Sequence, residues 1–157
     1  MGLRYELNHD VDTVRKKLSD PQFLADRLVA VGEERPEVSV AEVNGLPVIT
    51  LKREQRRDLP KVAAKIIGEV QRFEQTEKWF PEGTGWRGEY HINIIGAPVV
   101  IDATFDLLPA DGGCIYTITH MPKAKVPLVG KVLEKYLVEQ TRIGCIKELD
   151  YLAKELG

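Results

Sequence analysis

The stretch WRGEYHINIIGAPVVIDATFDLLPADGGCIYTITHM, residues 86–121, decides the fold. Apolar and polar side chains alternate along each of its three runs, which is the period of a half-buried β-strand. The turn residues Gly96-Ala97-Pro98 and Pro109-Ala110-Asp111-Gly112-Gly113 separate these runs. Because the connections are short, consecutive strands must be antiparallel, and the stretch predicts a β-meander. In the last run both faces are apolar, so the sequence leaves open which face points inward.

Upstream of the meander, the same alternation predicts four more strands, at residues 3–7, 38–43, 48–53 and 70–80. Asp10 and Asp20 are N-caps for two short helices that follow the first strand. Asn44-Gly45 is a tight hairpin turn between the second and third strands. A short amphipathic helix, Leu59 to Ile67, precedes the strand that begins at residue 70.

Downstream of the meander, the pattern is helical from Leu128 to the end of the chain. Such a helix would be roughly 40 Å long at 1.5 Å per residue, which is enough to cross a whole sheet. One apolar stripe runs from Val129 to Ile143, and a second, on nearly the opposite side, runs from Cys145 to Leu156. The two stripes predict a kink or irregular turn at or near Gly144, or else a second partner over one half of the helix, such as the other copy in a homodimer.

Two motifs carry a resemblance to a known family. The first is Asn8-His9-Asp10-Val11 with Ser19-Asp20-Pro21, and the second is Val126-Pro127-Leu128-Val129-Gly130 with Glu134 and Glu139-Gln140. With them the sequence resembles the START-related, birch-pollen-allergen-like (SRPBCC) superfamily, and within it a bacterial branch known only as a domain of unknown function. The resemblance covers essentially the whole chain, so we expect one START-like domain over residues 1–157.

The resemblance implies an α+β fold of the helix-grip type. In this fold a curved, antiparallel, seven-stranded sheet, ordered β-α-α-β6 with a short inserted helix, wraps around a long C-terminal helix. The motifs that carry the resemblance cap helices and join the last strand to the long helix. They contain no catalytic residue that could be transferred to this chain.

Composition excludes several classes of function. The chain has 157 residues, and its 22 Lys and Arg against 24 Asp and Glu give a net charge of −2, so no basic field indicates a nucleic-acid partner. The longest apolar stretch, residues 92–101, is too short to span a bilayer, and no signal peptide is recognisable, so we expect no integral membrane association. Cys114 and Cys145 form no disulfide framework, which favours a cytoplasmic protein with reduced thiols.

Three motifs that suggest chemistry have simpler interpretations. Gly83-Thr84-Gly85-Trp86-Arg87-Gly88 matches GxGxxG, but a strand follows where a dinucleotide site needs a helix, so we expect a hairpin turn. The three histidines lack zinc-site spacing, and we expect neither metal nor cofactor. The charged run from Arg53 to Asp58 is expected to be a solvated strand end and loop.

We expect the protein to bind or carry a hydrophobic small molecule, because the resemblance implies a cavity between the sheet and the C-terminal helix. Lipids, isoprenoids and polyketide-like molecules are the implied ligand classes. The expected ligand-binding residues are Phe73, Glu77, Trp79, Trp86, Tyr90, Phe105, Tyr116, His120, Tyr136 and Gln140. Leu59, Val62, Ile66 and Ile67 of the short helix are expected to form a lid over the cavity.

Two alternatives stay open at this stage. The first is an enzyme of the polyketide cyclase or aromatase type, with Glu77, His120 and Tyr90 as candidate acids and bases. The second is a protein-interaction module whose cavity is filled by its own side chains. The polar residues Gln71, Gln75 and Glu77 on an apolar strand face indicate a wet cavity, unless Glu77 and His120 lie at strand ends near solvent.

Overall fold

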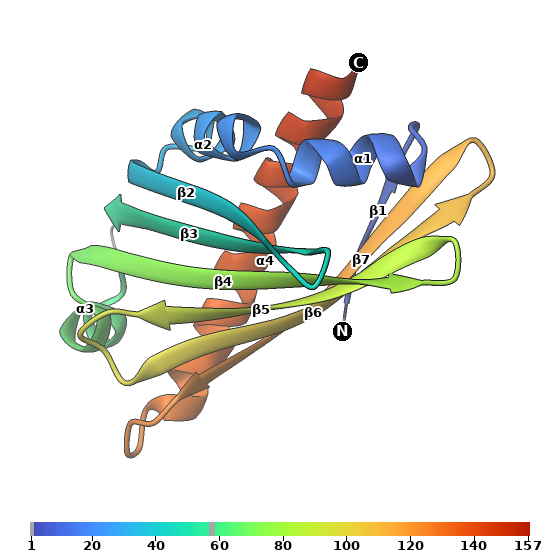
Figure 1. Cartoon of the computed structure of the whole chain (residues 1–157). Helices are drawn as coiled ribbons and strands as arrows, with labels where there is room; N and C mark the ends of the chain where they lie inside the picture. The colour runs from blue at the N-terminus through green and yellow to red at the C-terminus, as the bar shows by residue number, and fades with distance from the viewer. Residues whose placement is uncertain (1, 57–58) are drawn as a thin grey trace.

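The computed structural model describes residues 2–56 and 59–157, and within them it confirms the predicted α+β fold (Figure 1). The elements in chain order are β1 (Leu3–Leu7), α1 (Val11–Leu18), α2 (Pro21–Ala30), β2 (Glu34–Val43), β3 (Leu46–Arg56), α3 (Lys61–Ile67), β4 (Val70–Glu82), β5 (Gly85–Ile94), β6 (Val99–Ala110), β7 (Gly113–Ala124) and α4 (Gly130–Leu156). The strands form one curved sheet in the order β1-β7-β6-β5-β4-β3-β2. The long helix α4 packs against this sheet.

Every neighbouring pair of strands is antiparallel, as the short turns predict. The GxGxxG match lies in the hairpin between β4 and β5, where Gly83 takes a positive φ of 58°. Gly88 is needed for close packing, because a Cβ there would lie 2.1 Å from Cζ of Phe105. The prediction of a hairpin turn is therefore confirmed.

Alternation along the strands decides which side chains face α4. In β4 the residues Gln71, Phe73, Gln75 and Trp79 are buried and Glu77 is half-buried on the same face, whereas the alternate side chains are exposed. In β7 the buried face carries Cys114, Tyr116 and Ile118, followed by the half-buried His120. This settles the inward face of the last strand, which the sequence left open.

The two N-terminal helices are capped as predicted. Asp10 accepts a hydrogen bond from the backbone N–H of Thr13 at 2.9 Å, and Asp20 accepts one from the backbone N–H of Gln22 at 3.0 Å. A side chain that accepts from an unpaired N–H stabilises a helix start by about 1 kcal/mol. These caps fix the place where α2 begins, and α2 in turn packs against β2 and α4.

Helix α4 continues as α-helix through Gly144, so the predicted irregular turn is wrong. The buried face lies between the two apolar stripes and takes residues from both. Leu133 and Leu137 come from the first stripe, and Leu149 and Leu152 come from the second. The far edge of the first stripe is left in solvent. One buried face of α4 therefore takes part of its residues from each stripe.

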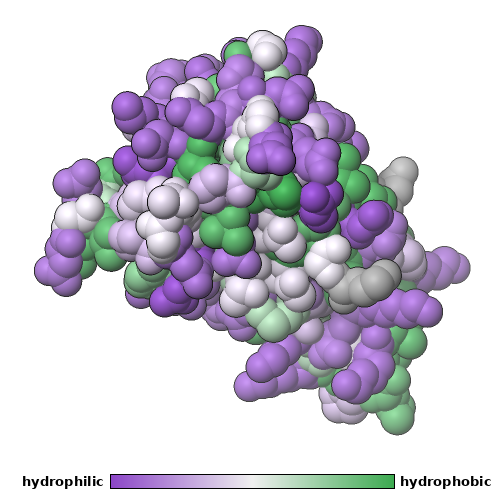
Figure 2. Space-filling view, turned by 90° about the vertical axis from the view of Figure 1, so that its right-hand side faces the viewer, coloured by the Kyte–Doolittle hydropathy of each residue, from purple (hydrophilic) through white to green (hydrophobic). Residues whose placement is uncertain are grey.

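The buried hydrophobic residues form two separate clusters. The first cluster joins α1, α2 and the C-terminal half of α4 to the sheet, and the second joins α3 and the N-terminal half of α4 to the sheet. Tyr90 packs against both clusters. On the surface, hydrophilic residues dominate the face in Figure 2 and break its hydrophobic residues into small patches.

Candidate functional site

A cavity of about 130 Å³ lies between the sheet, α2 and the middle of α4. Its wall takes residues from both core clusters, for example Leu51 from the first and Phe73 from the second. The cavity therefore separates the two clusters. Lys147 belongs to its wall and is exposed, so the cavity reaches the surface beside this residue.

The apolar part of the wall comes mainly from the sheet, and α1, α2 and α4 add further residues. The sheet contributes, among others, Leu51, Phe73, Ile92, Ile101 and Ile118. Gly144 of α4 also lines the cavity, and a Cβ built at this position would meet no atom within 4 Å. The missing side chain of Gly144 thus leaves open volume inside the protein.

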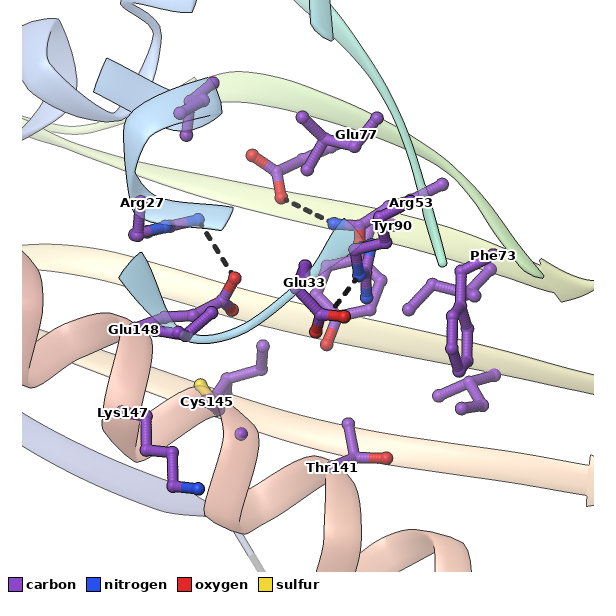
Figure 3. Close-up of a pocket in the computed structure, with 18 of the residues that line it drawn as sticks. Arg27, Glu33, Arg53, Phe73, Glu77, Tyr90, Thr141, Cys145, Lys147 and Glu148 are labelled. Atoms are coloured by element: carbon purple, nitrogen blue, oxygen red, sulfur yellow. Dashed lines mark hydrogen bonds and ion pairs between the residues drawn. The ribbon is translucent and has the colours of Figure 1, made fainter. Parts of the chain in front are cut away.

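The polar part of the wall contains two ion pairs that join different elements (Figure 3). Arg27 of α2 lies 3.6 Å from Glu148 of α4, and Arg53 of β3 lies 3.7 Å from Glu33, which precedes β2. Arg53 also donates a hydrogen bond of 3.0 Å to Gln75. Removing one partner of a buried pair leaves an uncompensated charge, so each pair holds its two elements together.

Glu77 of β4 is the third carboxyl group in the cavity wall. It accepts a hydrogen bond of 2.8 Å from Nε1 of Trp79 and one of 3.4 Å from the Gln75 amide. Protein atoms surround it, but its surface is partly accessible because it faces the cavity. Burial raises the pKa of Glu77 above its ordinary value, although these two N–H donors and the charge of Arg27 favour the ionised form.

Two tyrosines carry hydroxyl groups to the same cavity. Tyr90 of β5 and Tyr116 of β7 line it, and neither hydroxyl forms a hydrogen bond with a described residue. Burial raises the pKa of both phenols well above the ordinary value, so both stay protonated and can donate. Burial also raises the pKa of the Cys145 thiol to about 12, which makes it a poor nucleophile.

The structure places six of the ten predicted ligand-binding residues in the cavity wall, namely Phe73, Glu77, Trp79, Tyr90, Tyr116 and Gln140. Trp86 and Phe105 lie behind the wall instead. The ring of Phe105 lies 4.8 Å from that of Trp79, and the ring of Trp86 lies 6.4 Å from it. These two residues support the wall but do not line the cavity.

The remaining predicted residues lie outside the described wall of the cavity. His120 contacts Tyr90 at 6.0 Å between ring centres, and Tyr136 packs against the second cluster. The residues predicted as a lid, Leu59, Val62, Ile66 and Ile67, lie on or beside α3. Ile67 is buried in the second cluster and Val62 is 42% exposed, so α3 closes one end of the core rather than this cavity.

Sequence reasoning missed the charged residues of the wall. The expectation of a solvated run from Arg53 is wrong for Arg53 and Gln55, which continue the inward face of β3 after Ile49 and Leu51. Residues 57–58 of that run lie outside the described residues. Arg27 could have been found, because it occupies the apolar stripe of α2 next to Leu28.

Comparison with known proteins places the chain in a family. A family model described as "Protein of unknown function (DUF2505)" matches residues 3–155. The chain belongs to this family. No curated protein matches the sequence. No helix within the described residues combines the length and the apolar character that crossing a membrane requires.

Several solved bacterial structures share the fold of this family member. A Thermus thermophilus protein aligns with a TM-score of 0.66 and 16% identity over 98% of this chain and 94% of its own. A Chromobacterium violaceum protein aligns with a TM-score of 0.56 and 20% identity over 98% of this chain and 94% of its own. A Rhizobium leguminosarum protein, itself described as uncharacterised, aligns with a TM-score of 0.57 and 11% identity over 98% of this chain and 90% of its own. At these identities the likeness shows the fold alone.

Proposed function

We propose that this protein binds a hydrophobic small molecule in the cavity between its sheet and α4. The observation that carries the proposal is an interior volume lined by both apolar residues and polar groups, among them Arg27, whose buried Nε–H has no hydrogen-bond partner among the described residues. Pockets for small molecules combine an apolar wall with a few placed polar groups in this way. The resemblance to the START-related superfamily supports the same function.

Stability alone does not explain the charged wall. Buried ion pairs can often be replaced by apolar residues of similar volume without loss of stability. The Nε–H of Arg27 is buried and has no hydrogen-bond partner among the described residues. A polar atom of the ligand, or a water molecule in its absence, would satisfy such a donor.

The volume bears on the size of the ligand. A cavity of about 150 Å³ in another protein holds benzene, so about 130 Å³ suits a group the size of one ring. A fatty acid, isoprenoid or polyketide would place one such group inside and extend along the opening near Lys147. The open volume also favours a ligand-binding protein over an interaction module with a filled interior.

The cytoplasmic location stays a prediction from the sequence.

Thermal unfolding of the full chain with toluene, benzyl alcohol, geraniol and decanoate tests the proposal. A ligand at 100 times its Kd stabilises by about 2.7 kcal/mol, which corresponds to a rise in Tm of roughly 5–10 °C for a chain of this size. Gly144→Leu directs a side chain into the open volume and should abolish the rise while the fold is kept. Recovery of the ligand unchanged would distinguish binding from turnover.

Two results would contradict ligand binding in this cavity. If no compound raises the Tm and native mass spectra of gently purified protein show no bound molecule, the ligand-binding proposal is wrong. An equal rise in Tm for Gly144→Leu would show that the compounds bind elsewhere on the protein.

A further inference from the structure

We propose that the ligand carries a protonated amine, and that its ammonium group binds the carboxylate of Glu77. This inference rests on the proposed function, because it assigns the polar end of the ligand held in the same cavity. Glu77 lies between the guanidinium groups of Arg27 and Arg53 in Figure 3, and its carboxyl group points into the space between them.

Away from the opening, the cavity wall of the free protein holds two guanidinium groups and three carboxyl groups. Arg27 is paired with Glu148 and Arg53 with Glu33, which leaves Glu77 as a carboxyl group without an ion pair among the described side chains. Its two hydrogen bonds come from the neutral donors Trp79 and Gln75. A buried carboxylate needs a positive partner or a proton. With one ammonium group added to the two guanidinium groups, each of the three carboxylates would have one cation as its partner.

An anionic ligand fits this wall less well. It would add a fourth negative charge to a region that holds two guanidinium groups, and both of these groups already have carboxylate partners. The further cation of the wall, Lys147, is exposed at the opening, where water screens its charge. Like charges in a poorly solvated site repel strongly. The Nε–H of Arg27 can instead donate to a neutral acceptor on the ligand or to water.

Aromatic rings beside Glu77 favour the same chemistry. Trp79 donates to the carboxylate, and Tyr90 and Tyr116 line the cavity next to it. The face of an aromatic ring attracts a cation, and the attraction is largest where water is excluded. A carboxylate among aromatic rings therefore suits an ammonium group, while Phe73 and Leu137 would contact the apolar body of the ligand.

Benzylamine, benzyl alcohol and benzoate form a matched set for the test, because they share one ring and differ in the charge of the substituent. NMR titrations of the full chain would measure Kd for each compound. We expect benzylamine to bind at least tenfold more tightly than benzyl alcohol. In Glu77→Gln the preference for benzylamine over benzyl alcohol should fall to within about threefold.

Glu74→Gln is the matched control, since Glu74 lies on the same strand but is exposed on the opposite face. It should keep the full preference for benzylamine. Circular dichroism of both variants checks that the fold is kept. In Glu77→Gln the new side chain would still offer an amide oxygen to the indole N–H of Trp79.

The outcomes separate the two proposals. If the compounds bind but benzylamine has no advantage, or if benzoate binds most tightly, the amine inference is wrong while ligand binding stands. If Glu77→Gln leaves the preference for benzylamine intact, the cation binds elsewhere and the assignment to Glu77 is wrong. If no compound binds, the proposed function itself fails.

Discussion

Replacing Gly144 by alanine should make the protein more stable and its cavity smaller. Gly144 lies in the middle of α4, and an added Cβ would meet no atom within 4 Å. The substitution therefore brings the higher helix propensity of alanine without a steric cost. A methyl group in the cavity wall also adds buried apolar surface.

The two contributions can be estimated separately. Glycine is about 1 kcal/mol less favourable than alanine inside a helix. Burying one more carbon adds at most about 0.8 kcal/mol. The free energy of unfolding should thus rise by about 1–2 kcal/mol, which corresponds to a Tm increase of roughly 3–6 °C in a chain of this size.

Urea unfolding followed by circular dichroism measures this difference, and Gly130→Ala provides a control in the same helix. A Cβ at Gly130 would lie 2.7 Å from the carbonyl oxygen of Ala124, so this variant should lose about 1–3 kcal/mol. A lower stability for Gly144→Ala with an intact helix would refute the open volume on which the site depends. If Gly144→Ala and Gly130→Ala both raise the free energy of unfolding, or both lower it, the same reasoning is refuted.

Three further predictions concern stability. Burial lowers the pKa of His120 from 6.5 to about 4, so its stabilising contribution should be lost as the pH falls from about 6.5 through 4. This fall in the free energy of unfolding is at most about 3 kcal/mol. His120→Leu should remove this part of the pH dependence, which urea unfolding at pH 7 and pH 4 measures. An unchanged pH dependence would contradict the burial of this ring. Gly88→Ala should lose about 1–3 kcal/mol because its Cβ would meet the ring of Phe105 at 2.1 Å, and wild-type stability would count against that contact. Because burial raises the pKa of Glu77, its ionisation opposes folding as the pH rises above the ordinary carboxyl range. Glu77→Gln should therefore be more stable than the wild type at pH 8 but not at pH 4, and an equal difference at both values would refute this.

The fold could be predicted because its signals are local. Alternation along residues 86–121 and the turn glycines specify the strands, and short turns leave only antiparallel pairing. Asp10 and Asp20 mark two helix starts that the structure confirms. The order from β2 to β7 then follows from the chain, since each of these strands pairs with the next one along the sequence, whereas β1 pairs with the distant β7.

The cavity was only partly predictable, because it depends on distances between elements far apart in the chain. Gln75 and Glu77 were found as polar groups on an apolar strand face, and Tyr90 was found as an aromatic residue of the sheet. Arg53 was assigned to solvent because it begins a charged run, although β3 extends far enough to keep it on the inward face. Glu148 lies between the two stripes of α4, where only the packing of the helix shows that it faces inward.

The separation of the two hydrophobic clusters explains how the fold can accommodate a charged interior. Fully buried residues such as Leu28 and Leu152 stabilise one end of α4, and Leu133 stabilises the other end. Since both ends of the helix are packed, its middle can carry Gly144 and Glu148 without losing its place on the sheet. Gly144 should therefore tolerate substitution better than the fully buried residues of either cluster. A Leu152→Ala substitution, by contrast, should cost about 2–5 kcal/mol.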